Sequence, residues 1–188
     1  PEHVFTFKDA LMGYRELLAT DRFIASALTT AFQTAVFFAM MGFIAYSFER
    51  MSISPKEFGV WMATTSVGYV IGNLANKRLL NRYRIEIITF VGAIASLMCL
   101  LLMEIWHTTA PNSPMGLAIP MLLVGLSNGV IIANSIIIAS SAIPRLRGSA
   151  TGLVGAMQMG AGGIAGTVAI WLGADQDTNV GILTLLVI

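Results

Sequence analysis

Charged residues are scarce in this sequence: Asp, Glu, Lys and Arg make up 11% of its 188 residues, against roughly 25% in soluble domains. Hydrophobic residues make up 56%, so we expect most of the chain to avoid water. The net charge of +1 gives no electrostatic basis for nucleic-acid binding. The single cysteine, Cys99, cannot form an internal disulfide and does not make a metal site, so no metal or other cofactor is expected.

The apolar residues are gathered in long blocks, which is typical of membrane-spanning helices. About 20 apolar residues are needed to cross a bilayer core of roughly 30 Å. We predict spans at about 23–48, 58–75, 86–105, 116–142 and 148–172, with a partial sixth span at 180–188. The sequence therefore predicts an all-α membrane protein, a six-helix transmembrane bundle over residues 23–188 whose last helix is truncated.

Residues 1–22 precede the first span and have an amphipathic pattern. Phe7, Leu11, Tyr14 and Leu18 recur at helical spacing, and charged residues lie off this stripe. We predict a cytoplasmic linker with a short helix at the membrane surface, and a plain connector helix is the alternative. Because the chain starts without Met and stops inside an apolar run, we expect both of its ends to be cut.

The connections between the spans alternate in charge. If the N-terminal segment is cytoplasmic, two cations, Arg50 and Lys56, lie on the outer side. The inner side then holds nine: Lys8, Arg15, Arg22, Lys77, Arg78, Arg82, Arg84, Arg145 and Arg147. This excess follows the positive-inside rule and predicts that the first span runs outward.

No Asp, Glu, Lys, Arg or His falls inside the apolar cores of the five full spans, with the third core taken as 87–103. An ionisable residue at mid-membrane would be a functional candidate by default. If the protein is proton-coupled, we therefore expect the titratable group to lie mainly in a part of the protein that this sequence does not include.

Uncharged polar residues do occur at depth. An amide in hydrocarbon needs hydrogen-bond partners, so it faces another helix or a wet cavity. We predict a substrate cavity lined by Gln33, Phe37, Tyr69, Asn128, Asn134, Met157 and Gln158. Hydrogen bonding between helices is the alternative role for each amide.

Small residues recur every three to five positions in the fifth span. Gly148, Gly152, Gly155 and Gly160 are predicted to pack against another helix, either statically or in a helix that bends and slides as a gate must. The short inner connections carry a second set of candidates, with roles in an inner gate or in orientation: Gly72, Lys77, Arg78, Arg82, Arg145 and Arg147. Control of topology by positive charge is the alternative.

Residues 147–159, which contain a run of small residues and end in Gly-Ala-Met-Gln-Met, resemble the eleventh helix of major facilitator superfamily drug transporters, in particular the Bcr/CflA-type drug-resistance group. The basic connection after Gly72 is similar to the loop between helices eight and nine of that superfamily, although Asn76 stands where an Asp often occurs. The resemblance implies the C-terminal half of a twelve-helix fold. It also implies that the first, second, fourth and fifth spans line the cavity.

We therefore expect a secondary active transporter that expels drugs or other small amphipathic molecules, with the proton gradient as its energy source. A major facilitator carrier for a neutral metabolite or sugar is one alternative, and a non-transporting membrane scaffold is another. An enzyme is not expected, because both histidines lie outside the spans and the spans hold no acid pairs. The expected location is the bacterial cytoplasmic (inner) membrane. The expected partners are lipid, a small-molecule substrate and a missing N-terminal six-helix half, and no nucleic acid.

Overall fold

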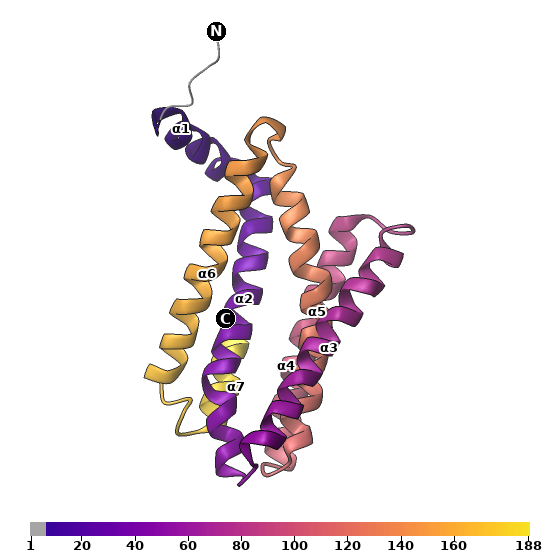
Figure 1. Ribbon diagram of the computed structural model, residues 1–188, viewed down its shortest axis with the longest axis vertical. Coiled ribbons are helices and arrows are strands. Elements are labelled where there is room, and N and C mark those ends of the chain that lie inside the picture. Colours follow the sequence, from indigo (N-terminus) through magenta and orange to yellow (C-terminus); the bar gives the residue numbers. More distant parts are fainter. Residues whose placement is uncertain (1–6) are drawn as a thin grey trace.

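The computed structural model describes residues 7–188, with side chains from residue 11 onward, and these residues form helices joined by short connections (Figure 1). In chain order the helices are α1 (Phe7–Leu18), α2 (Asp21–Arg50), α3 (Pro55–Leu79), α4 (Ile85–Thr109), α5 (Pro114–Ser140), the 3-10 turn η1 (Pro144–Leu146), α6 (Arg147–Trp171) and α7 (Thr178–Val187). The described residues contain no β-strand, as the apolar blocks predict.

Four of these helices are long and apolar enough to cross a membrane, namely α2, α4, α5 and α6. Helix α3 has a similar length, 25 residues, but it carries more polar residues. Helix α7 has 10 residues, which is about half of a bilayer crossing. The six-span count therefore stays a prediction.

The helices extend a few residues beyond the apolar blocks because their ends are polar. Helix α3 starts at Pro55, and the side chain of Ser54 accepts a hydrogen bond from the backbone N–H of Glu57 at 3.3 Å. Helix α7 starts after Asp177, whose carboxylate accepts from the backbone N–H of Asn179 at 2.8 Å. These caps satisfy backbone groups at helix ends that lie outside the apolar blocks.

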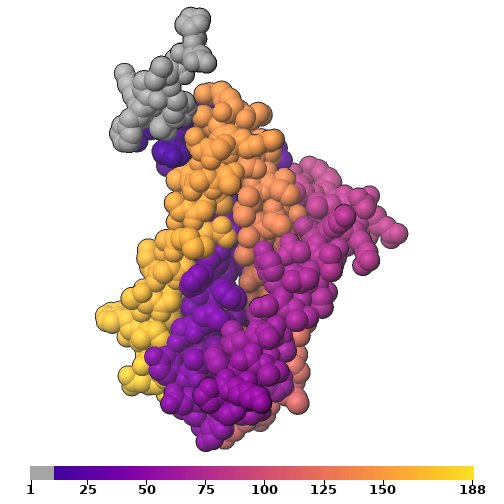
Figure 2. Space-filling model, viewed as in Figure 1, coloured from indigo at the N-terminus to yellow at the C-terminus, as the bar shows by residue number. Residues whose placement is uncertain are grey.

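The helices form two closely packed groups that meet along α2 and α5. Helix α2 packs mainly against α6, while α3 and α4 both pack against α5. Figure 1 shows α1, the α3–α4 connection and the α5–α6 connection at one end of the bundle, which we call the basic end. In the space-filling view α2 is visible between α6 and α3 (Figure 2). The cations predicted to be cytoplasmic lie in α1, at helix termini or in the connections that meet at this end.

The crossing of α3 and α5 is very close because both helices place glycines in it. A Cβ atom added to Gly68 or Gly72 of α3 would overlap the backbone carbonyl oxygens of Leu122 or Leu126. On α5, Gly129 approaches the carbonyl oxygen of Tyr69 in the same way. Small residues four apart allow this approach of two helix backbones. The crossing sets the relative position of the side chains on either side of it.

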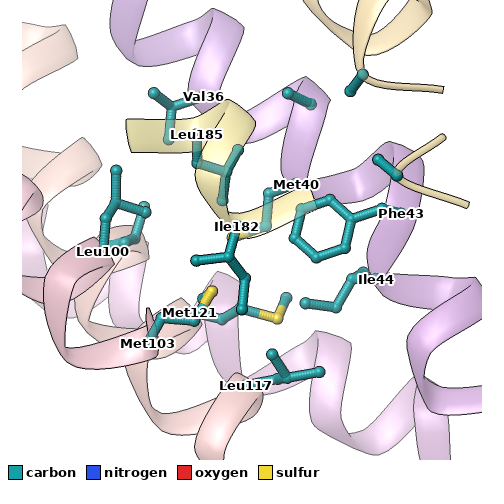
Figure 3. Packing of buried hydrophobic residues seen from close by; sticks show 14 of the residues in the cluster. Val36, Met40, Phe43, Ile44, Leu100, Met103, Leu117, Met121, Ile182 and Leu185 are labelled. Atoms are coloured by element: carbon teal, nitrogen blue, oxygen red, sulfur yellow. The ribbon is translucent and has the colours of Figure 1, made fainter. Parts of the chain in front are cut away.

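The main core lies toward the end opposite the basic end. Figure 3 shows side chains from α2, α4, α5 and α7 meeting there, among them Phe43, Met103, Met121 and Ile182. All four are fully buried or nearly so. A second, smaller cluster at the basic end joins α1, α2, α5 and α6, and it includes Leu17. The short helix α1 is thus attached to the bundle by an apolar contact.

Candidate functional site

A pocket of about 350 Å³ lies between α2, α3 and α5, at the side of the α3–α5 crossing. Its walls are mostly apolar, and no charged residue lines it. The lining residues are Phe37 from α2, Met62, Thr65, Ser66, Tyr69 and Val70 from α3, and Gly125, Asn128 and Ile132 from α5. A pocket of this kind suits a small, mainly apolar molecule.

Two polar atoms in the wall lack a partner. Asn128 Oδ1 and Thr65 Oγ1 are buried, and neither has a hydrogen bond to another described residue. Asn128 is 3% exposed and Thr65 is 4% exposed. An unpaired polar atom in an apolar surrounding costs free energy, so a bound molecule that reached either atom would gain a hydrogen bond there. The carboxamide oxygen of Asn128 accepts hydrogen bonds only, and it would therefore select a donor group.

The close crossing explains how these groups come together. Gly125 lies beside Thr65 of α3, and Asn128 follows it by about one helical turn, so its side chain points along the same edge of the contact. Phe37 closes the pocket from α2, and its ring meets that of Phe38 edge to face with centroids 5.8 Å apart. Phe38 in turn packs over Gly162 of α6, where a Cβ would lie 2.9 Å from the ring.

Three of the predicted cavity residues, Phe37, Tyr69 and Asn128, line this pocket together. The pattern of aromatic and amide residues at depth was the signal that pointed to them. Thr65 was missed, and it could have been found because it lies one turn before Tyr69 on the same face of a helix. Ser66 was also missed, as an ordinary small polar residue with no distinguishing spacing.

The structure places three of the other predicted residues, Gln33, Asn134 and Gln158, in helix–helix contacts. Gln33 donates from Nε2 to Ser96 Oγ of α4 at 2.8 Å, away from the pocket. Asn134 of α5 exchanges two hydrogen bonds with Asn76 of α3, at 2.8 and 3.0 Å. Both amides are at least nine-tenths buried. Both amides therefore make hydrogen bonds between helices, which is the alternative to lining a substrate cavity.

Gln158 and Met157 lie on α6, outside the pocket. Gln158 donates from Nε2 to Thr34 Oγ1 of α2 at 2.9 Å, so this amide joins the two helices of one group. Met157 is half-buried against the apolar cluster at the basic end. Neither side chain lines the space beside Asn128.

Comparison with known families identifies the kind of protein that holds this pocket. The family model of the Major Facilitator Superfamily matches residues 23–188, which is most of the chain. The chain belongs to the Major Facilitator Superfamily. No curated protein matches the sequence. The superfamily consists of transporters rather than enzymes, and the chain is thus part of an integral, multi-pass membrane protein.

The basic residues of this facilitator form two separate groups at the basic end. Lys77, Arg78 and Arg82 lie in and before the α3–α4 connection, are exposed, and have no carboxylate partner within 4.0 Å among residues 11–188. Arg145 differs, because it pairs with Glu16 of α1. Arg147 begins α6 and is exposed. The connections are therefore accessible, and one of them is tied to the linker helix.

A further ion pair joins α2 to α4 at the same end. Arg22 Nη2 lies 3.4 Å from Glu86 Oε1, and Arg84 Nε lies 3.7 Å from the other oxygen of Glu86. All three side chains are largely exposed, so the pair adds little to stability by itself. Both carboxylate oxygens of Glu86 are thus paired with neighbouring arginines, Arg22 and Arg84.

The glycines of α6 predicted from the sequence to pack against another helix face open space in the described part of the chain, so their packing role stays a prediction. At Gly148, Gly152, Gly155 and Gly160 an added Cβ would meet no atom within 4 Å. These glycines therefore make no close helix contact within the described part of the chain. Two other glycines of α6 do face α2: Gly162 lies under the ring of Phe38, and a Cβ on Gly166 would lie 3.5 Å from the carbonyl oxygen of Phe38. They share this side of α6 with the buried residues Ala165 and Ala169. The spacing of small residues alone does not tell which helical face meets a neighbour.

Proposed function

We propose that this facilitator is a secondary active transporter that expels small amphipathic molecules, and that the pocket beside Asn128 is part of its substrate path. One observation carries the proposal: a mainly apolar pocket holds a buried carboxamide oxygen with no partner. A ligand with an apolar body and one N–H or O–H donor would fill the pocket and satisfy this atom.

The composition of the wall favours such molecules over sugars. A sugar carries many hydroxyl groups, each of which loses hydrogen bonds to water and needs a replacement. The polar side chains in the wall are Thr65, Ser66, Tyr69 and Asn128, and the remaining residues are apolar or glycine. A carrier for a neutral metabolite remains the second candidate, supported by the absence of any charged residue in the wall.

The open glycine face of α6 supports a partner bundle. Gly152, Gly160 and Gly163 are exposed and face open space, so a helix from outside the described residues could approach α6 closely. We propose that a second six-helix half lies against this side and rocks against α2–α7 during transport. The proposed location is the bacterial cytoplasmic membrane, with the basic end inside.

The test uses the full-length protein in proteoliposomes with an imposed pH gradient. Uptake or release is measured for a series of dyes of similar size, some with and some without an N–H or O–H donor. Asn128→Leu should reduce transport of the donor-bearing dyes roughly tenfold, as expected for one lost hydrogen bond to a buried group, and should leave the others nearly unchanged.

The matched control is the double variant Gln33→Leu with Ser96→Ala. It removes a buried amide and its partner hydroxyl at the α2–α4 contact, outside the pocket. Transport of both dye classes should persist in this control. If Asn128→Leu transports the donor-bearing dyes as fast as the parent protein does, the role of Asn128 is refuted. If the transport rate does not change with the imposed pH gradient, proton coupling is refuted.

A further inference from the structure

A second cavity, of about 340 Å³, opens on the other side of α5. Its lining comes from the end of α3, the first half of α4 and the middle of α5. The residues that matter for the argument are Leu79, Tyr83, Ile87, Val91, Leu126 and Val130. Almost all of the lining surface is apolar. We refer to this cavity as the α3–α4 groove.

The groove and the candidate substrate pocket lie on opposite faces of α5. Successive residues of an α-helix advance by about 100°, which puts Leu126 and Val130 on the face opposite Asn128 and Ile132. The groove side also exposes large apolar side chains: Ile87 is 51% exposed and Val91 is 58% exposed. In a multi-pass membrane protein such a surface meets the acyl chains of lipids.

The groove reaches the basic end of the bundle at Leu79 and Tyr83. These two residues alternate in sequence with cations, since Lys77 and Arg78 precede Leu79, and Arg82 precedes Tyr83. Among residues 11–188 no carboxylate pairs with these three cations, whereas the neighbouring Arg84 lies 3.7 Å from Glu86. None of the three cations lines the groove itself, but all three are exposed within two residues of Leu79 or Tyr83, and the described residues do not neutralise their charge.

We propose that the α3–α4 groove binds an anionic phospholipid, with one acyl chain between α3 and α4 and its phosphate on Lys77, Arg78 and Arg82. An apolar channel with exposed cations near one end is complementary to a molecule with an apolar tail and an anionic head. Basic clusters beside membrane helices attract anionic lipids in this way. The proposal does not depend on which molecule the protein transports.

The experiment is native mass spectrometry of the detergent-solubilised full-length protein, titrated with phosphatidylglycerol or phosphatidylcholine. The parent protein should retain phosphatidylglycerol in preference to phosphatidylcholine. Replacing Lys77, Arg78 and Arg82 with Gln should weaken retention of phosphatidylglycerol roughly tenfold or more, because each cation near a headgroup contributes to binding. The matched control removes three other cations of the same end: Arg15→Gln, Arg145→Gln and Arg147→Gln.

A second variant tests the groove without changing the charge. Val91→Trp fills the space between α3 and α4, and it should lower retention of phosphatidylglycerol while the three cations stay in place. Inorganic phosphate at millimolar concentration should not displace the lipid, since it lacks an acyl chain.

Four results would overturn the proposal. The first is equal retention of the two lipids by the parent protein. The second is an equal loss in the control triple variant, which would indicate general attraction to the basic end. The third is full retention of phosphatidylglycerol by Val91→Trp, and the fourth is displacement of the lipid by inorganic phosphate. Either of the last two would reduce the site to an anion on exposed cations.

Discussion

The reciprocal hydrogen bonds between Asn76 and Asn134 provide the sharpest test of how this bundle is held together. The two carboxamides join α3 to α5 at 2.8 and 3.0 Å, and the exposed fractions of the two residues are 4% and 0%. Replacing one Asn with Leu, which has a similar shape, removes both bonds and leaves the other amide buried without a partner. Replacing both removes the unpaired group as well.

The magnitudes follow from the two bonds. An interhelical hydrogen bond in a membrane protein contributes about 0.6 kcal/mol on average, so the pair contributes about 1 kcal/mol. An unpaired buried amide costs roughly 1–3 kcal/mol more. We expect Asn76→Leu and Asn134→Leu each to lower the free energy of unfolding by about 2–4 kcal/mol, and the double variant by about 1 kcal/mol or less. The double variant should therefore be more stable than either single variant.

The measurement is reversible unfolding in mixed micelles of dodecylmaltoside with increasing dodecyl sulfate, followed by circular dichroism. Asn73→Leu is the control, because Asn73 lies one turn earlier on α3 and donates only to Tyr69 O of its own helix, at 3.0 Å. If the double variant loses as much free energy of unfolding as the two single variants added together, the two amides act independently. That result would refute the idea that they stabilise the fold as a hydrogen-bonded pair.

Two further predictions concern the helix crossing and the connection opposite the basic end. Gly72→Ala should destabilise the fold by several kcal/mol, because its Cβ would overlap the carbonyl oxygen of Leu126. In the same unfolding assay Gly59→Ala on the same helix should be neutral or stabilising by up to about 1 kcal/mol, because its Cβ meets open space and Ala favours the helix. Equal losses would show that the close approach is unimportant. Arg50 of α2 donates to Thr178 Oγ1 at 2.8 Å and also to the carbonyl of the α6–α7 connection, so Arg50→Gln should speed amide hydrogen exchange at residues 173–178 by roughly fivefold or more. Unchanged exchange there would mean that the arginine does not hold the connection.

The location of the helices could be predicted closely from the sequence. The predicted block 23–48 corresponds to α2 at Asp21–Arg50, and the block 148–172 corresponds to α6 at Arg147–Trp171. Both follow from local composition, because a long segment without charges is more stable in lipid than in water whatever lies beside it. The family could be predicted for the same reason, since its pattern of blocks and basic connections is distributed along the chain.

The roles of single polar residues were harder to predict. Gln33 and Asn128 look alike in the sequence, as one amide in the middle of an apolar block, yet Gln33 bonds to Ser96 and Asn128 Oδ1 has no partner. Likewise Gly152 and Gly72 both belong to sets of closely spaced small residues, but of these two only Gly72 lies in a close crossing within the described residues. The composition around each residue does not distinguish these cases.

The sequence by itself determined that the chain is a set of apolar helices with one basic end, because the free energy of placing each segment in a membrane is a property of that segment alone. The tertiary structure decided which amides are paired, which glycines are covered and where an unpartnered oxygen borders a pocket. Those outcomes depend on how each helix is rotated about its own axis, and that rotation is set by contacts with residues about 60 or more positions away, such as Gln33 with Ser96 and Asn76 with Asn134.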